Sequence, residues 1–429
     1  MYDYDLIVIG GGIAGYTAAL KASSFNKRVA LFENNKLGGT CLNRGCIPTK
    51  SLLKTSVYYS TYADNLLLAT KHIDTLRFNL ENLMIKQKIN IINETACITS
   101  IHQVSYNNIS LSSEYIIIAT GSTPIIPNIK GINIDNIYTS DFFFTHGVDT
   151  KELVIVGGGV IGTEMALVYS NLGCKVTIIE QEHTILSNFD REISQNLTMI
   201  YKKKGINIFT NTKVLEFIKD NHIICKCINS NNEEILIPTE CVLLSVGRCP
   251  NTSNLYSSDI SINLDYKSII VNDNYQTSIA NIFAIGDVIK GSLQLAHLAE
   301  AQACNVINFL YNNSFKKNTS LVPMCVYTKP EIAVIGINEK QAKSLVINYR
   351  VEKRLTSSNG RSIIENADRG FAKFIISNDT NEILGCCLMC LFASEIISTI
   401  TLAISQNNTL NDIESIIFPH PTISEFMCN

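Results

Sequence analysis

The chain has 429 residues, too many for one ordinary hydrophobic core, so we expect about two to four domains. Hydrophobic residues make up 46% of the composition and charged residues 17%, which excludes a disordered or fibrous protein. The formal net charge of −3 provides no basic surface, so we expect neither nucleic acid nor an anionic membrane as a partner.

The first residues lead directly into an apolar strand, without the basic segment and cleavage site of a signal peptide. No later apolar run reaches the roughly 18 residues that a membrane helix needs. We therefore expect a cytoplasmic protein with no membrane span. Because thiols stay reduced in that compartment, the 14 cysteines predict no structural disulfide framework, and any disulfide should take part in chemistry.

A dinucleotide-binding pattern opens the chain. Residues 5–9 form an apolar strand, a glycine-rich turn follows, and an alanine-rich helix continues to about residue 24. The turn has the spacing Gly-x-Gly-x-x-Gly, with Gly10, Gly12 and Gly15. A second strand at residues 28–32 then ends in Glu33, an acid placed as in a dinucleotide fold.

Two cysteines follow the first pattern. Cys41 and Cys46 lie five positions apart at a predicted helix start, where they can close a small disulfide ring. A helix N-terminus lowers the pKa of a thiol placed there, which suits a reversible redox pair. The alternatives are two buried thiols or half of a zinc site, although no second cysteine or histidine pair of suitable spacing accompanies these two.

The dinucleotide-binding pattern occurs a second time. A strand at residues 153–156 precedes a helix that ends near residue 172, and a strand at residues 175–179 ends in Glu180. The turn between the first strand and the helix carries Gly157, Gly159 and Gly162. In both copies the acid follows the third glycine by 18 residues, close to the roughly 20 of a dinucleotide fold.

The spacing has a physical reason. The first glycine permits a tight turn, the second lets the backbone approach a pyrophosphate, and the third lets helix and strand pack closely. The helix N-terminus then directs its N–H groups at the phosphates. Two such patterns predict two bound nucleotides, and Glu180 favours NAD over NADP because its carboxylate repels a 2′-phosphate.

The remaining segments give weaker signals. Residues 105–112 suggest a hairpin or loop between strands, residues 258–276 alternate weakly and carry turn residues, and a separate C-terminal domain is expected from about residue 323. Further cysteines lie in apolar runs typical of strands, where we expect core packing: Cys225, Cys227, Cys386, Cys387 and Cys390.

Several motifs together resemble the pyridine nucleotide-disulfide oxidoreductases, and the resemblance extends over nearly the whole chain. The segments that carry it are residues 38–50, 116–122, 245–251, 281–287, 326–331 and 420–425. It implies an α/β fold with two Rossmann-like dinucleotide-binding domains, for FAD and NAD, and a C-terminal α+β dimerisation domain. The domains implied are 1–150 with 259–320 for FAD, 151–258 for NAD, and 321–429 for dimerisation.

The resemblance also implies roles for individual residues. Cys41 would exchange disulfides with the substrate and Cys46 would face the flavin. His420, oriented by Glu425, would serve as acid-base in the partner subunit's site, and Lys50 would pair with Glu164. Cofactor contacts would involve both glycine turns with Glu33 and Glu180, and further Gly39, Thr40, Lys50, Thr120, Gly121, Gly247, Arg248, Gly286, Asp287, Ala296 and His297; no metal is expected.

The implied reaction is oxidation of dihydrolipoyl groups, carried by the lipoyl domain of a 2-oxoacid dehydrogenase or glycine cleavage complex, by a homodimer. Mercuric reductase-like, glutathione reductase-like and transhydrogenase activities are alternatives within the family, and a noncatalytic flavoprotein subunit is one outside it. The sequence departs from the family pattern at Arg44, where many relatives are apolar, and at Phe418, where a histidine is common. Cys428 lacks the terminal partner that mercury reduction requires.

Overall fold

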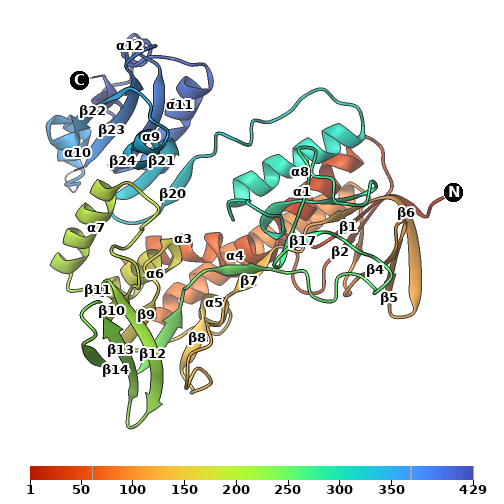
Figure 1. The fold of residues 1–429 in the computed structure, drawn as a ribbon, viewed down its shortest axis with the longest axis horizontal. Coiled ribbons are helices and arrows are strands. Elements are labelled where there is room, and N and C mark those ends of the chain that lie inside the picture. Colours follow the sequence, from red (N-terminus) through yellow and green to blue (C-terminus); the bar gives the residue numbers. More distant parts are fainter. Residues whose placement is uncertain (60, 368–369, 429) are drawn as a thin grey trace. The chain divides into compact units, whose positions relative to one another are not determined.

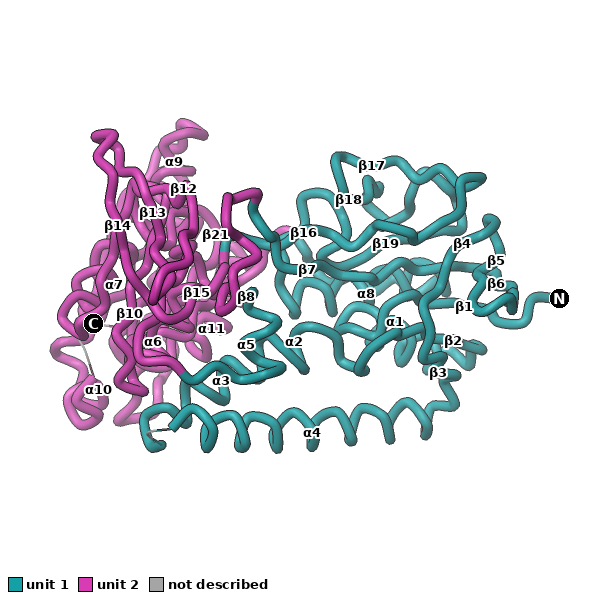
Figure 2. The backbone as a smooth tube through the Cα atoms, turned by 90° about the horizontal axis from the view of Figure 1, so that it is seen from below, with its two compact units in different colours: residues 1–127, 138–149, 246–319 teal, residues 128–137, 150–245, 320–429 magenta. Residues whose placement is uncertain are grey.

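Figure 1 shows the chain in a computed structural model, which describes residues 1–59, 61–367 and 370–428. It divides into two compact units, each assembled from separate stretches of sequence (Figure 2). Unit 1 comprises residues 1–127, 138–149 and 246–319, and unit 2 comprises residues 128–137, 150–245 and 320–429. The three domain ranges given above stay a prediction; residues 246–258, assigned there to the NAD domain, lie in unit 1.

Unit 1 is built on a seven-stranded sheet with the order β3-β2-β1-β6-β5-β4, and β19 also pairs with β6. Strands β3, β2, β1, β6 and β19 are parallel, whereas β4, β5 and β6 form an antiparallel meander. The strands span Tyr4–Ile9 (β1), Val29–Phe32 (β2), Asn90–Ile92 (β3), Cys97–Ser100 (β4), Gln103–Tyr106 (β5), Ile109–Ile118 (β6) and Ile282–Ala284 (β19). The expected hairpin at residues 105–112 is thus the β5–β6 connection.

The first predicted strand-turn-helix-strand unit is confirmed as β1, α1 and β2, and its helix ends at Ser23. Helices α1 and α8 pack side by side (Figure 1). The helices of unit 1 span Ile13–Ser23 (α1), Gly39–Arg44 (α2), Cys46–Thr55 (α3), Tyr62–Lys86 (α4), Ser140–His146 (α5) and Ala296–Leu310 (α8). Shorter pieces are β7 (Ser122–Pro124), β16 (Arg248–Pro250), β17 (Leu264–Asp265), β18 (Ser268–Ile269) and the 3-10 turn η1 (Gly286–Val288).

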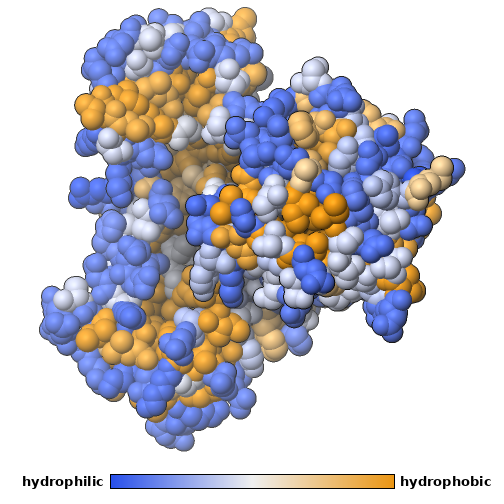
Figure 3. Space-filling model, turned by 45° about the vertical axis from the view of Figure 1, so that its right-hand side comes forward, coloured by the Kyte–Doolittle hydropathy of each residue, from blue (hydrophilic) through white to orange (hydrophobic). Residues whose placement is uncertain are grey.

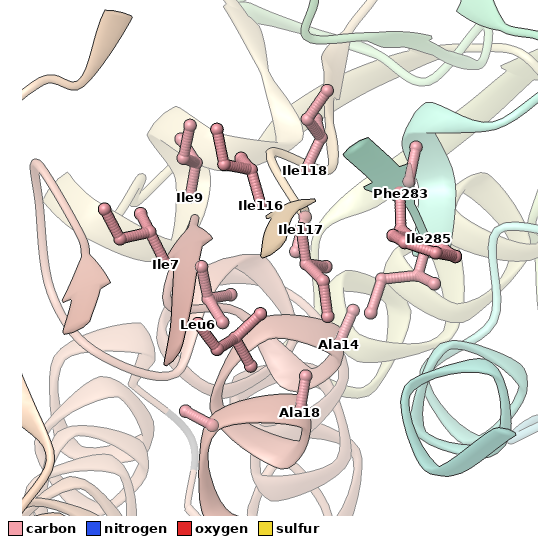
Figure 4. Close-up of a cluster of buried hydrophobic side chains, with 14 of the residues drawn as sticks. Leu6, Ile7, Ile9, Ala14, Ala18, Ile116, Ile117, Ile118, Phe283 and Ile285 are labelled. Atoms are coloured by element: carbon pink, nitrogen blue, oxygen red, sulfur yellow. The ribbon is translucent and has the colours of Figure 1, made fainter. Parts of the chain in front are cut away.

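The core of unit 1 lies where the central strands meet α1 (Figure 4). Leu6 and Ile7 on β1, Ile117 on β6 and Phe283 on β19 are 0% to 1% exposed, and Ala18 presents a small face of α1 to them. Strands buried on both faces read as continuous apolar runs, which is why residues 5–9 and 116–118 do not alternate. This packing fixes where the strands end, and the glycine turn begins there.

In unit 2 the strands β11, β10, β9 and β15 run parallel in that order, and β12, β13 and β14 form an antiparallel sheet. They span Glu152–Val156 (β9), Lys175–Ile179 (β10), Asn207–Phe209 (β11), Thr212–Lys219 (β12), Ile223–Asn229 (β13), Glu234–Thr239 (β14) and Cys241–Leu244 (β15). The helices are α6 (Val160–Asn171) and α7 (Arg191–Lys203). The second predicted strand-turn-helix-strand pattern is therefore confirmed as β9, α6 and β10. The short strand β8 (Ile137–Thr139) lies where the chain passes from a stretch of unit 2 to a stretch of unit 1.

The C-terminal part of unit 2 holds an antiparallel sheet with the order β20-β21-β24-β23-β22. The separate domain expected from about residue 323 stays a prediction, since these residues share a compact unit with residues 150–245. Its strands are Met324–Val326 (β20), Glu331–Gly336 (β21), Tyr349–Leu355 (β22), Phe371–Ser377 (β23) and Ile383–Cys390 (β24). Its helices are Glu339–Ser344 (α9), Gly360–Ile364 (α10), Ala393–Ser405 (α11) and Leu410–Glu414 (α12), with 3-10 turns at Thr356–Ser358 (η2) and Ile423–Met427 (η3).

The cysteines expected in strands lie in the core, on β13 and β24. Each is at most 6% exposed: Cys225, Cys227, Cys386, Cys387 and Cys390. Large apolar side chains also reach the surface, and Figure 3 shows apolar residues gathered in patches among hydrophilic ones. In the C-terminal part of unit 2 the exposed apolar residues include Leu402, Ile416 and Ile417. Within the described residues, no helix combines the length and apolar character needed to cross a bilayer.

Candidate active site

The segment with the two cysteines, residues 38–50, begins in contact with the first glycine turn and is called the redox segment below. Gly38 and Gly39 have φ angles of 98° and 59°, which glycine adopts most readily. These angles turn the chain so that the Gly38 N–H donates to the Gly11 carbonyl at 2.8 Å. A Cβ on Gly39 would lie 2.6 Å from the Gly12 Cα, so only glycine permits this approach. The redox segment therefore covers the turn that Gly10 opens.

Two short helices carry the cysteines, where the sequence suggests one helix start. Cys41 lies in α2, and Cys46 is the first residue of α3. Gly45 separates the helices, and a Cβ there would lie 2.9 Å from the Thr40 carbonyl oxygen. The missing side chain lets α3 begin directly beside α2, which brings the two sulfurs within hydrogen-bonding reach of each other.

The two thiols differ in their electrostatics. The hydrogen bond with Cys46 is the largest cause that raises the pKa of the Cys41 thiol, burial adds to it, and the Lys50 ammonium opposes both. Cys46 is the first residue of α3, and the N-terminal end of a helix favours a thiolate there. Burial and then the charge of Cys41 raise the pKa of Tyr16 on α1 to about 12, so this phenol stays protonated beside the pair.

The residues between the cysteines are held from both sides. Asn43 donates through Nδ2 to the carbonyls of Leu37 and Gly39, at 3.0 and 2.9 Å, and its Oδ1 accepts a hydrogen bond from Arg77. Arg44 forms an ion pair with Asp141 of α5 at 2.9 Å. The departure at Arg44 thus introduces a paired charge.

A polar chain connects several predicted cofactor residues in unit 1. The Ser122 hydroxyl donates to Asp287 at 2.6 Å and accepts from Nε of Arg248 at 2.8 Å. The Thr120 hydroxyl donates to the Asn251 carbonyl at 2.6 Å, and the Asn251 amide returns a hydrogen bond of 3.0 Å to the Thr120 carbonyl. Positions predicted from three separate motifs therefore share one hydrogen-bonded framework.

The remaining predicted residues of unit 1 lie at turns and helix starts. Gly286 has a φ of 80° and donates its N–H to the Gln302 side chain at 2.7 Å. Gly247 is exposed, has a φ of 112°, and accepts the Ile125 N–H at 3.0 Å. Ala296 and His297 form the first turn of α8. The structure thus places these residues on ordered backbone, and their roles stay predictions.

The first glycine turn fits the pyrophosphate of a flavin dinucleotide. A Cβ at Gly12 would meet only the Gly39 Cα, at 3.9 Å, and one at Gly121, in the separate turn between β6 and β7, would meet nothing within 4 Å. Glu33 accepts the Gly11 N–H at 2.9 Å and the Asn35 N–H at 2.8 Å, which fixes its carboxylate at the end of β2. An open space, a helix N-terminus and a fixed acid are the elements that such a site needs.

The second glycine turn repeats this geometry in unit 2. Glu180 accepts the Gly158 N–H at 2.6 Å and the Glu182 N–H at 2.8 Å. A Cβ on Gly162 would lie 2.0 Å from the Gly157 carbonyl oxygen, so glycine is required where α6 meets β9. Gly159 is exposed, and a Cβ there would meet nothing within 4 Å. The turn therefore borders open space.

Glu164 lies on α6, is 2% exposed, and accepts the Tyr327 N–H at 2.9 Å. Its expected partner, Lys50, belongs to unit 1, so their pairing stays a prediction. In the C-terminal part, His420 Nδ1 lies 2.8 Å from Glu425 Oε1, and the imidazole is 79% exposed. The hydrogen bonds from the Thr422 backbone and from His420 lower the pKa of the Glu425 carboxyl, which thus stays ionised at neutral pH.

Comparison with known families matches both parts of the chain. A sequence model described as pyridine nucleotide-disulphide oxidoreductase matches residues 4–303, and the dimerisation domain of the same family matches residues 322–429. The chain belongs to the pyridine nucleotide-disulphide oxidoreductase family. Membership confirms the predicted fold class, the FAD- and NAD-linked oxidoreductase chemistry and a dimerisation domain, which supports a homodimer.

Several proteins of the family resemble the chain over nearly its whole length. Dihydrolipoyl dehydrogenase of Bacillus subtilis is 33% identical, over 99% of this chain and 96% of that protein. The enzyme of the same name from Buchnera aphidicola is 34% identical over 98% and 93%. Leghemoglobin reductase of Vigna unguiculata is 32% identical over 99% and 86%.

A solved structure of another family member has the same fold. The HOCl-induced flavoprotein disulfide reductase RclA of Escherichia coli superposes with a TM-score of 0.91 at 28% identity, covering 99% of this chain and 98% of that one. Its Cu(II) complex gives the same TM-score.

The sequence assigned no individual role to four residues that the structure connects to the candidate site: Asn43, Ser122, Asp141 and Asn251. Ser122, Asp141 and Asn251 act through partners distant in sequence, as with Ser122 and Asp287, which lie 165 positions apart. A short polar residue directly after the Thr120-Gly121 turn was the available signal for Ser122. Asp141 carries no motif of its own.

Proposed function

We propose that the chain is a dihydrolipoyl dehydrogenase, which oxidises dihydrolipoyl groups to the cyclic disulfide and reduces NAD to NADH. The observation that carries this proposal is the full-length similarity to enzymes of that name, at 32% to 34% identity. The lipoyl domain of a 2-oxoacid dehydrogenase or glycine cleavage complex would be the partner, in the cytoplasm. Glu180 supports NAD, because its carboxylate at the end of β10 disfavours a 2′-phosphate.

The cysteines exchange one disulfide for another. A thiolate of the dihydrolipoyl group attacks Cys41 in the Cys41–Cys46 disulfide, which forms a mixed disulfide and releases Cys46 as a thiolate. The second substrate thiolate then attacks the mixed disulfide, so lipoamide leaves oxidised and the cysteines are left reduced. Bound FAD would supply the redox chemistry that links oxidation of this dithiol to reduction of NAD to NADH. The position of Cys46 supports this division, because it is the first residue of α3 and a helix N-terminus stabilises a thiolate.

His420 takes and returns the substrate protons. Its Nδ1 faces the Glu425 carboxylate, so Nε2 is the nitrogen that can accept a thiol proton. We assign this histidine to the active site of the partner subunit, and the ion pair of Lys50 with Glu164 to the vicinity of the flavin. The lowered pKa of Glu425 keeps its negative charge, which fixes the tautomer and stabilises the imidazolium.

Anaerobic titration of the purified holoenzyme with dihydrolipoamide and then NAD tests this function. We expect a long-wavelength absorption band of the reduced enzyme, followed by NADH. The band should persist in Cys41→Ser and disappear in Cys46→Ser, because only Cys46 supplies the thiolate beside the flavin. Loss of the band in Cys41→Ser alone would reverse the two roles, and equal reduction by NADPH would contradict the cofactor preference.

A histidine variant tests the acid-base role. His420→Gln should lower kcat with dihydrolipoamide by about 10² to 10⁴-fold, the usual range for removing a general base, while flavin content stays unchanged. His222→Gln is the matched control, since His222 is exposed in unit 2 between β12 and β13. Equal turnover of the two variants would remove His420 from the mechanism.

A further inference from the structure

Asp141 joins two arginines beside the redox segment. It lies in the first turn of α5, and its Oδ2 is 2.9 Å from Nε of Arg44, while its Oδ1 is 3.4 Å from Nη1 of Arg248. The side chains of Arg44, Asp141 and Arg248 are 27%, 21% and 11% exposed. Ion pairs that are this shielded from water are screened less than exposed ones.

Arg44 connects this carboxylate to the cysteines. It is the last residue of α2, between Cys41 and Cys46, and its Nε is buried. That Nε approaches Asp141 as an ion pair, without the alignment of a hydrogen bond. Lys50 is the cation that acts on the Cys41 thiol, whereas the Arg44 charge is met by Asp141.

Arg248 connects the same carboxylate to the cofactor side. Its guanidinium donates to the Ser122 carbonyl at 2.6 Å and to the Thr40 hydroxyl at 3.4 Å. Ser122 in turn donates to Asp287 at 2.6 Å. Asp141 therefore lies at the junction of the redox segment with the framework that ends at Asp287.

We propose that Asp141 is a positioning residue that sets the charge around the redox pair, because it neutralises Arg44 and holds it against Arg248. The inference rests on the proposed function in that Cys46 is taken as the working thiolate. The three groups carry a net charge of +1 when all are ionised. Substitution of Asp141 raises this net charge, and substitution of Arg44 lowers it.

The two substitutions should have opposite effects. In Asp141→Asn the unmatched Arg44 cation stabilises the Cys46 thiolate and lowers its pKa. In Arg44→Met the net charge falls, so the pKa of Cys46 rises. The double variant restores the original net charge and should return the pKa close to that of the wild type. A role confined to packing would move both single variants in the same direction.

The test is the pH dependence of iodoacetamide alkylation of the reduced holoenzyme, followed on the Cys46 peptide by mass spectrometry. We expect the midpoint to fall by about half a pH unit in Asp141→Asn and to rise by about half a unit in Arg44→Met, as a unit charge acting through a partly shielded medium would cause. The double variant should lie between the single variants, near the wild type. Shifts of equal sign, or none, would overturn the proposal.

Asp5→Asn is the matched control, because Asp5 belongs to the same unit, is 24% exposed, and pairs with Arg28 at 2.8 Å. Its midpoint should equal that of the wild type, and a shift like that of Asp141→Asn would overturn the proposal. The alkylation midpoint needs neither lipoamide nor NAD. A wild type that fails with dihydrolipoamide yet shows opposite shifts in the two variants would contradict the proposed function and support this inference.

Discussion

The two glycine turns of the molecule are nearly identical in backbone and differ in what borders them. Gly10 and Gly157 open their turns with φ angles of 107° and 106°. A Cβ on the third glycine would meet the first glycine's carbonyl oxygen at 1.7 Å in unit 1 and 2.0 Å in unit 2. In both turns the acid that ends the second strand accepts a backbone N–H of the turn.

The second glycines show the difference. Gly12 is half-buried and faces Gly39, where α2 begins, whereas Gly159 is exposed with no neighbour for a Cβ within 4 Å. The redox segment thus covers the first turn, while the second opens to solvent. The same turn conformation can therefore hold a nucleotide as a resident cofactor in unit 1 and bind a second nucleotide reversibly, as a substrate, in unit 2.

Substitution of the third glycines should give the largest effects. Gly15→Ala places a methyl group against backbone in the core of unit 1, so we expect little folded, flavin-containing protein. Gly162→Ala should retain FAD and lose most NAD-dependent turnover, since its clash lies at the second turn. Flavin absorbance per subunit and NADH formation are the measurements.

Gly360→Ala is the control for these variants, because a Cβ there would meet nothing within 4 Å and it should resemble the wild type. If Gly162→Ala lost flavin to the same extent as Gly15→Ala, the two turns would not act as separate sites.

The sequence predicted the features that depend on near neighbours. The strands, turns and acids of both dinucleotide units follow from spacing within about 30 residues, and the structure confirms these elements. It did not show the break at Gly45, because the need for glycine there comes from contact with Thr40 in three dimensions.

The hydrogen bonds that connect the side chains of the site could also not be predicted from the sequence. Arg248 reaches Thr40 across 208 positions, and Ser122 reaches Asp287 across 165. Such pairs are set by how the sheet brings segments together, and a single sequence does not show which distant residues will be partners. Arg44 shows the consequence, since the sequence marked it as a departure and only the fold supplies its partner, Asp141.

The buried Lys373 stabilises the segment that follows Glu180. Its removal should give the next largest effect, a loss of folding stability. Lys373 on β23 is 6% exposed and contacts Asp190, which caps α7, at 2.9 Å; it also pairs with Glu339. Lys373→Met removes the cation that pairs with the buried Asp190 carboxylate, and the loss of one partner of a buried ion pair typically costs about 3 to 5 kcal/mol. Denaturant unfolding of the holoenzyme should show this loss.

Lys353→Met provides the matched control in the same unit. Lys353 pairs with Glu192 while 37% exposed, so its loss should cost only about 0 to 1 kcal/mol. Equal destabilisation by both variants would show that burial of Lys373 is not what matters.

Substitution of Glu180 or Glu33 should give the smallest effects, and the two variants should differ in which nucleotide they bind less well. Glu180→Ala should raise the KM for NAD about tenfold, since two hydrogen bonds to a ribose diol are lost and one factor of ten corresponds to about 1.4 kcal/mol. It should also reduce the preference for NAD over NADP, because the charge that repels a 2′-phosphate is removed. Flavin content should not change, and steady-state kinetics with both nucleotides measures the effect.

Glu33→Ala should affect the other nucleotide: FAD should be retained less well, and the KM for NAD should be unchanged in the flavin-saturated enzyme. The contrast depends on enclosure as well as on the lost carboxylate, because the cover that begins at Gly39 remains in place over the first turn. The flavin should therefore dissociate slowly during dialysis, whereas NAD binding at the open second turn should weaken at once. If both variants changed only the KM for NAD, Glu33 would have no part in holding the cofactor, and the assignment of the covered turn to FAD would fail.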